Sequence, residues 1–172
     1  MAPTNNLYAN MTPEMEALLR DAGFLGVARL RQCSYDWHLI SALVERWRPE
    51  THTFHLPGGE CTIMLQDVAI LTGLPIDGRP ITGRVQRNYL DLCQSLLGIT
   101  PEPMNIRYSL VRSSWFMQHF SELPQQVSQM TLNQHTRAYI LQLYSSVLFL
   151  KFDTSKVNLL FLQYLENMDL IG

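Results

Sequence analysis

The stretch that decides the fold runs from Leu43 to Gly83 and reads LVERWRPETHTFHLPGGECTIMLQDVAILTGLPIDGRPITG. Within it, residues 51 to 56 alternate polar and apolar side chains, which is the pattern of a half-exposed β-strand. The sequence Pro-Gly-Gly-Glu at 57–60 is typical of a turn, and residues 61 to 64 return as a second strand. The stretch therefore predicts a β-hairpin over about Thr51–Met64.

Helices are predicted on both sides of the hairpin. Leu65 to Thr72 has the pattern of a short helix that Gly73 closes in the left-handed cap conformation. Before the hairpin, Asp36 is a suitable N-cap for a helix from Trp37 to Trp47, and Pro49 ends that helix. The apolar residues of this helix fall on one helical stripe: Trp37, Ile40, Val44 and Trp47.

Helical patterns also dominate the rest of the chain. Residues 1–11 are expected to form a flexible lead, and Thr12, Pro13 and Glu14 make a helix start that Gly23 ends. Further helices are predicted over Phe24–Gln32, Arg87–Leu97, Leu110–Phe120, Thr131 to about Leu150 and Ser155–Asp169, with a loop over Ile99–Tyr108.

The expected core lies in the second half of the chain. Trp115, Phe116 and Phe120 are core candidates, and the segment Ala138–Leu150 is apolar nearly all round, as in a central buried helix. The predicted fold is therefore mainly α: a single helical domain with one small β-hairpin.

Three runs of residues carry a family resemblance: 42–57, 59–63 and 65–78. In these runs the chain resembles the plant mobile domain, a family often labelled aminotransferase-like. Weaker similarity extends over Glu16–Ser41 and Ala138–Phe149. Because the family's domain is longer than this chain, the resemblance implies that residues 12–172 form a partial plant mobile domain, corresponding to its N-terminal half.

The resemblance also implies a biological role. Relatives in this family act in meristem maintenance and in the silencing of transposable elements, and some lie beside long-form plant serine/threonine phosphatases. The chain is therefore expected to be a non-enzymatic interaction domain in the nucleus, with a phosphatase-like or sister mobile-domain protein as its partner. The alternative is a nucleic-acid-associated domain of mobile-element origin.

Composition narrows the class of protein further. The 172 residues carry a net charge of −2 at pH 7, which gives no electrostatic reason to expect nucleic acid, and only 16% of them are charged. Such sparse charge suggests that a partner covers part of the surface. Three distant cysteines favour a reducing compartment over a disulfide framework. The sequence shows no signal peptide, no bilayer-spanning run and no nuclear import cluster.

Catalytic chemistry is not expected from the residues available. A pyridoxal-phosphate enzyme needs a Schiff-base lysine and a phosphate-binding loop, but the only lysines are Lys151 and Lys156 and no glycine-rich loop follows a strand. A two-metal phosphatase needs clustered Asp, His and Asn ligands, and the five histidines lie in unrelated contexts. We therefore expect no catalytic residue, no metal site and no cofactor.

Two local patterns allow both a functional and a structural interpretation. His52, His55 and Cys61 are metal-ligating residue types, but strand positions 52 and 55 face opposite sides, so packing is the expected role. Residues 65 to 74 resemble the first helix and turn of a helix-turn-helix. The prolines and glycines that follow disfavour a recognition helix, so direct DNA readout is not the favoured interpretation.

One set of residues is the candidate partner surface: Arg46, Trp47, Arg48, Arg79, Arg84 and Arg87. Arginine and tryptophan often anchor protein interfaces, and arginines also contact phosphates. In the favoured structural interpretation, Trp47 is buried between solvated arginines, and the other three arginines lie on a solvated loop.

Two further expectations concern stability and self-association. The apolar residues near the C-terminus predict an exposed apolar patch that promotes self-association: Leu159, Leu160, Phe161, Leu162, Leu165 and Ile171. Met64 stands where members of the family carry Thr, and methionine lacks the oxygen that caps a helix. Met64→Thr is therefore expected to stabilise the fold.

Overall fold

The structure, a computed structural model, describes residues 11–30, 36–76, 88–124, 127–148 and 155–166. Its elements, in chain order, are α1 (Pro13–Asp21), α2 (Leu25–Arg29), α3 (Trp37–Glu45), β1 (Trp47–Arg48), β2 (Thr53–Leu56), β3 (Gly59–Cys61), α4 (Leu65–Thr72), α5 (Tyr89–Leu97), β4 (Ile106–Arg107), β5 (Leu110–Arg112), α6 (Ser113–Phe120), α7 (Gln129–Leu143), the π-helix η1 (Tyr144–Leu148), β6 (Lys156–Asn158) and the 3₁₀-helix η2 (Leu159–Leu165). The mainly helical prediction is confirmed. The strands form two three-stranded antiparallel sheets, β1-β2-β3 and β4-β5-β6.

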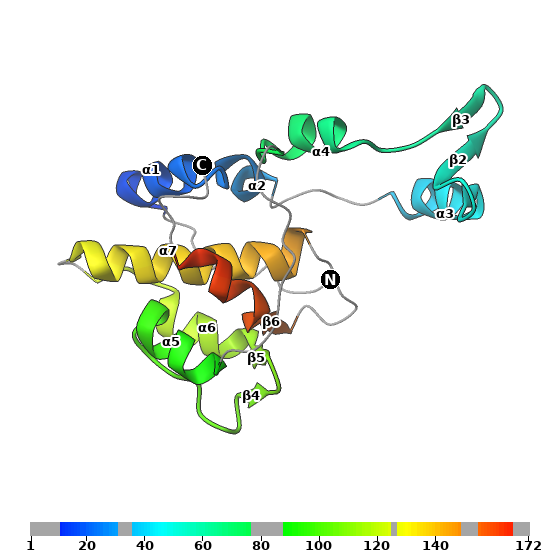
Figure 1. The fold of residues 1–172 in the computed structure, drawn as a ribbon. Coiled ribbons are helices and arrows are strands. Elements are labelled where there is room, and N and C mark those ends of the chain that lie inside the picture. The colour runs from blue at the N-terminus through cyan, green and yellow to red at the C-terminus, as the bar shows by residue number, and fades with distance from the viewer. Residues whose placement is uncertain (1–10, 31–35, 77–87, 125–126, 149–154, 167–172) are drawn as a thin grey trace.

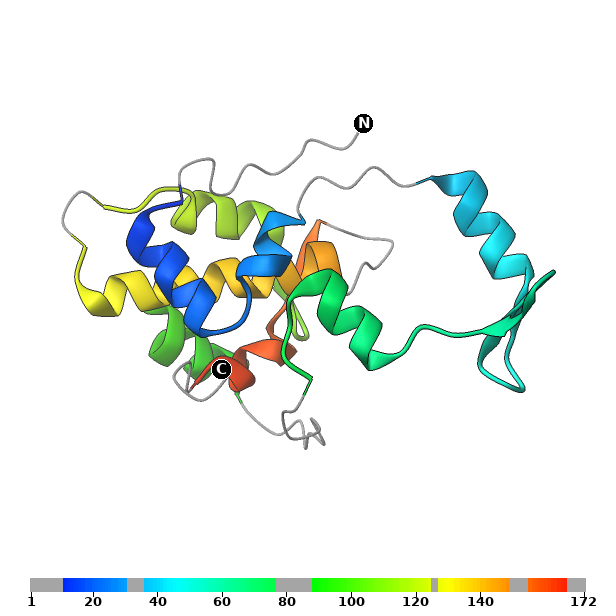
Figure 2. The same cartoon turned by 90° about the horizontal axis from the view of Figure 1, so that it is seen from above.

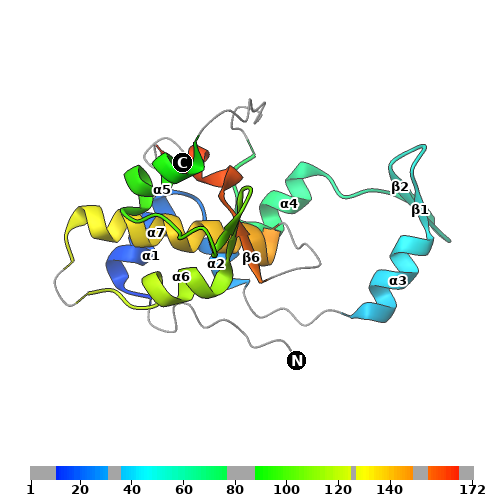
Figure 3. The same cartoon turned by 90° about the horizontal axis from the view of Figure 1, so that it is seen from below.

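Helix α7 is the centre of a helical body. It contacts α1, α5, α6 and η2, which surround it in Figures 1 and 3. Every residue from Ala138 to Leu143 is buried, which confirms the first part of the predicted central segment Ala138–Leu150. The prediction was wrong for Tyr144–Leu148, a π-helix without a buried residue, and residues 149–150 lie outside the described residues. Trp115, Phe116 and Phe120 are buried beside α7, as predicted, and the rings of Trp115 and Phe116 meet edge-on at 5.1 Å.

Two predicted helices were partly wrong, because their first residues form strands of the second sheet. The predicted helix over Leu110–Phe120 begins only at Ser113, because residues 110 to 112 form β5 and pair with β6. The predicted final helix over Ser155–Asp169 was wrong in its first turn, which is β6, and continues as η2. Val111 and Val157 lie opposite each other and are both buried, so burial of this pair favours the strands.

Local helix signals were mostly read correctly. Thr12 and Asp36 accept backbone hydrogen bonds as N-caps, and Gly73 closes α4 with φ of 72°. The predicted cap Thr131 was wrong by one turn, because Ser128 is the cap and accepts a hydrogen bond from the Thr131 backbone N–H at 3.1 Å. The predicted loop over Ile99–Tyr108 contains the short strand β4.

The predicted apolar patch near the C-terminus was wrong within the described residues. Leu159, Leu162 and Leu165 are 0% exposed because η2 packs against α5 and α7. Phe161 stacks on Tyr144 with ring centroids 4.8 Å apart. Ile171 lies outside the described residues.

Helix α4 meets the body through a very close contact with α2. A Cβ atom built on Gly26 would lie 2.2 Å from the carbonyl oxygen of Thr72, and a Cβ atom on Gly73 would lie 3.5 Å from the Gly26 Cα. Beside this contact, Gly23 (φ 73°) lies against the ring of Pro75. Only glycine at position 26 allows the two backbones to come this close.

Buried His135 makes stability depend on pH. His135 is 6% exposed and meets the Phe120 ring edge-on at 5.2 Å, and burial lowers its pKa. The unfolded chain therefore binds the proton more strongly, so the free energy of unfolding should fall as the pH drops below about 6.5. Urea titrations between about pH 7.5 and 5.5 should show a steeper loss for the wild type than for His135→Leu. Equal slopes for the two proteins would contradict this role of His135.

Met64→Thr is expected to raise the free energy of unfolding by about 0.5–1 kcal/mol. Met64 is the N-cap of α4, and its extended backbone (φ −94°, ψ 163°) resembles that of the caps Thr12 and Ser128, but its side chain accepts no capping hydrogen bond. The Asp67 carboxylate already accepts a hydrogen bond from the Met64 backbone N–H at 2.8 Å, so a threonine would complete the reciprocal pair. Met64→Thr should melt at a higher temperature than Met64→Ala, which, like the wild type, lacks the capping oxygen. Equal melting temperatures for the two variants would contradict the prediction.

Candidate functional site

An arm made of residues 36–64 stands away from the helical body in all three views (Figures 1, 2 and 3). It contains α3 and the sheet β1-β2-β3. No residue from Asp36 to Ile76 is buried, although this region is rich in apolar side chains. Trp37 and Val44, on the predicted stripe of α3, are 69% and 68% exposed. The stripe therefore lies outside the core of the body.

The predicted hairpin is confirmed, and a third strand extends it. β2 pairs with β3, and β1 pairs with the other edge of β2. The predicted helix from Trp37 to Trp47 therefore ends early, at Glu45, because Trp47 and Arg48 leave the helix to pair with Phe54 and Thr53.

The arm sheet has one apolar face and one polar face. Trp47 lies opposite Phe54, and Phe54 lies opposite Cys61, so these three side chains share a face. On the other face, Arg48 lies opposite Thr53 and His55 lies opposite Glu60: all four of these side chains are polar or charged. An antiparallel sheet with this alternation normally packs its apolar face against another layer.

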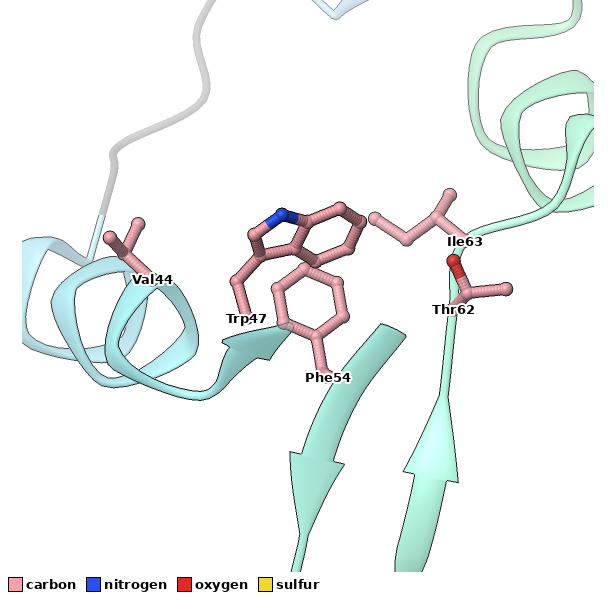
Figure 4. Close-up of a pocket in the computed structure, with 5 residues that line it drawn as sticks. All are labelled: Val44, Trp47, Phe54, Thr62 and Ile63. Atoms are coloured by element: carbon pink, nitrogen blue, oxygen red, sulfur yellow. The ribbon is translucent and has the colours of Figure 1, made fainter. Parts of the chain in front are cut away.

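The apolar face forms an open pocket of about 440 Å³, which Figure 4 shows. Five residues line it: Val44, Trp47, Phe54, Thr62 and Ile63. The rings of Trp47 and Phe54 meet edge-on with centroids 4.8 Å apart, and the Ile63 side chain points toward them. Trp47 is 38% exposed and Ile63 is 64% exposed, so the interpretation of Trp47 as a buried residue was wrong.

Hydrogen bonds on the polar side hold the hairpin in register. The Thr53 hydroxyl donates to a Glu60 carboxylate oxygen at 3.2 Å, and His55 Nδ1 lies 3.9 Å from the other oxygen of that carboxylate. The Thr62 hydroxyl donates to the backbone carbonyl of His52 at 2.8 Å, which fixes a residue with a left-handed φ of 54°. The apolar face is therefore presented by a strand framework that its own polar groups stabilise.

The arginines of the predicted partner surface are not gathered around the pocket. Arg46 folds back on α3, where its Nη1 donates to the Ala42 carbonyl oxygen at 2.9 Å. Arg48 lies on the polar face, across the sheet from Trp47 and Phe54. Arg79, Arg84 and Arg87 lie outside the described residues. Of the predicted surface, the structure brings only Trp47 into the pocket.

The sequence prediction missed the other pocket residues as site residues: Val44, Phe54, Thr62 and Ile63. The signal was present, because the alternation over residues 51 to 56 already placed Phe54 on the apolar side. The sequence did not show that Phe54 lies beside Trp47. That proximity depends on the pairing of β1 with β2, which forms only because the chain turns back between Arg48 and Thr53.

The described residues offer no other chemical site of comparable form. Across residues 11–30, 36–76, 88–124, 127–148 and 155–166, no group of three His, Cys, Asp or Glu residues could hold a metal ion. His55 and Cys61 lie on opposite faces of the arm sheet, so the pattern His52-His55-Cys61 does not converge. In the same part of the chain, no helix is long and apolar enough to cross a membrane. Lys151 and the residues that would begin a second helix after Ile76 lie outside it.

Comparison with known proteins gives consistent results. The sequence profile described as "Plant mobile domain" matches residues 23–172. In Arabidopsis thaliana, the chain is 46% identical over 151 residues to a protein named "Serine/threonine-protein phosphatase 7 long form homolog". It is 42% identical over 166 residues to "Protein MAIN-LIKE 1" and 36% identical over 164 residues to "Protein MAINTENANCE OF MERISTEMS".

These matches cover most of this chain but only part of each relative. They cover 88%, 94% and 94% of this chain, in the same order, and 11%, 33% and 34% of the relatives. No solved structure matches the chain.

Proposed function

The chain belongs to the plant mobile domain family, and we propose that it is a non-enzymatic protein-interaction domain whose binding surface is the apolar face of the arm. In this proposal the domain acts in the nucleus and supports meristem maintenance and the silencing of transposable elements, as the family resemblance implies. Its partner is a phosphatase-like protein or a sister mobile-domain protein.

One observation carries this proposal: no part of the chain that the structure describes covers the apolar face of the arm sheet. Trp47 and Phe54 are held in an edge-to-face pair beside Ile63 in an open pocket. Pre-arranged aromatic side chains are typical of the residues that contribute most to protein interfaces. A pocket without ionisable groups in its lining is suited to binding an apolar surface and offers nothing for acid–base chemistry.

The choice of partner rests on the relatives. A protein named as a phosphatase long form homolog contains a stretch 46% identical to this chain, and MAIN-LIKE 1 contains another. Such proteins would carry a domain of the same kind, which makes contact between related domains a natural arrangement. A nucleic-acid role through Arg46 and Arg48 is less well supported, because Arg46 is hydrogen-bonded to its own helix.

A pull-down from plant nuclear extract with the whole chain as bait tests this function. Trp47→Ala should lose a phosphatase-family or mobile-domain protein that the wild type recovers. Arg48→Ala is the matched control, because it removes the neighbouring side chain on the opposite face of the sheet. The recovery should persist as salt is raised, since an apolar contact is weakly screened. Nuclease-sensitive recovery that falls steeply with salt and depends on Arg48 would overturn the proposal in favour of nucleic acid.

A further inference from the structure

The exposed apolar side chains of the described residues are concentrated in one region. Among the residues that the structure describes, fifteen large hydrophobic side chains are exposed: ten lie between Trp37 and Ile76, and the other five are spread from Leu90 to Met130. The ten include Leu65, Ile70 and Leu71 on α4, which follows the arm directly. Exposed large apolar side chains that gather in one region are typical of an interaction site.

The size of this region suits an interface. Every residue from Asp36 to Ile76 is half-buried or exposed. A stable protein interface uses about 20–30 residues on each partner, which corresponds to roughly 800 Å² on each side.

We propose that the apolar face of the arm pairs with the same face of a second copy of this chain, so that two arm sheets pack face to face. This inference rests on the proposed function, and it names the partner as another mobile domain bound through the same surface. Two sheets that pack in this way lie about 10 Å apart and interdigitate their side chains.

The distribution of charge favours a second copy as the occupant. In a twofold interface each patch meets its own image, so any charge on the patch opposes the same charge. None of the five residues that line the pocket is a carboxylate or a base. Cys61 shares the apolar face, and the His52 ring lies at its edge, 6.4 Å from the ring of Trp47. The charged side chains Arg48 and Glu60 are confined to the opposite face. Self-pairing through the pocket lining therefore brings no like charges together.

Sedimentation of the purified chain over a concentration series is the test. We expect a dimer that Phe54→Glu weakens roughly 100-fold, because the symmetric interface would bury two unpaired carboxylates. His55→Glu is the matched control, one residue away on the polar face, and should leave the dimer intact. Circular dichroism should show both variants folded, because no arm residue contributes to the core of the body.

Thiol labelling gives a second readout. Cys61 is exposed on the apolar face of one copy, so dimerisation should slow its alkylation as concentration rises, and Phe54→Glu should restore it. Cys93 is the internal control: it is buried, which raises its pKa to about 12, and it should react only after unfolding. Peptide mass spectrometry distinguishes these two cysteines from each other and from Cys33.

Two outcomes would overturn self-pairing. The first is a chain that stays monomeric at its highest soluble concentration with Cys61 fully reactive. The second is larger aggregates that Phe54→Glu and His55→Glu form equally. Either outcome leaves the proposed function open to its own test, because recovery of a different partner that depends on Trp47 would still support an interaction domain.

Discussion

Gly26→Ala is expected to lower the free energy of unfolding by about 2 kcal/mol and to release α4 from the body. The new Cβ atom would lie 2.2 Å from the Thr72 carbonyl oxygen, well inside the contact distance. The obstacle is backbone in the last turn of α4, so no side-chain rotation can relieve it. The cost is limited because α4 buries none of its own residues and can move away instead of unfolding the core.

Urea denaturation and limited proteolysis measure the two parts of this effect. Gly26→Ala should shift the urea midpoint and expose residues 65 to 76 to protease. Gly58→Ala is the matched control, because no atom lies within 4 Å of a Cβ atom built there, and it should change stability by less than about 0.5 kcal/mol. Equal effects of the two substitutions would show that the contact between α2 and α4 does not form.

The elements that sequence predicted well are those fixed by local hydrogen bonds. Asp36 and Gly73 mark helix ends because a cap involves only atoms within a few residues along the chain. The hairpin could also be predicted from the sequence, because its two strands are neighbours in the chain and its turn lies between them.

The missed features all depend on distant parts of the chain. Residues 110 to 112 became a strand only because β6, far along the sequence, pairs with them. The contact of Gly26 with Thr72 has no local signature, because the sequence around Gly26 would look the same if α4 did not lie against it. Periodicity shows which side of an element is apolar, but it does not say whether the body covers that side, as exposed Trp47 illustrates.

Arg137→Met is expected to lower the free energy of unfolding by about 2–3 kcal/mol. The guanidinium of Arg137 donates from Nε to the Leu165 carbonyl oxygen at 2.9 Å and from Nη1 to the Leu96 carbonyl oxygen at 3.4 Å. It also donates from Nη2 to the Glu166 carbonyl oxygen at 3.4 Å. These carbonyls lie at the C-terminal ends of α5 and η2, where backbone acceptors lack helical partners and a positive charge is favourable.

Three variants separate the charge of Arg137 from its geometry in urea denaturation. Arg137→Lys keeps the charge but cannot direct donors to three carbonyls, so its stability should fall between the wild type and Arg137→Met. Arg20→Met controls for loss of an exposed arginine, because the Arg20 side chain is 64% exposed and forms only a 3.6 Å ion pair with Glu16, and it should cost less than about 1 kcal/mol. If Arg137→Lys equalled the wild type, charge alone would account for the effect. If Arg137→Met cost no more than Arg20→Met, the guanidinium would not connect α5 and η2 to the central helix.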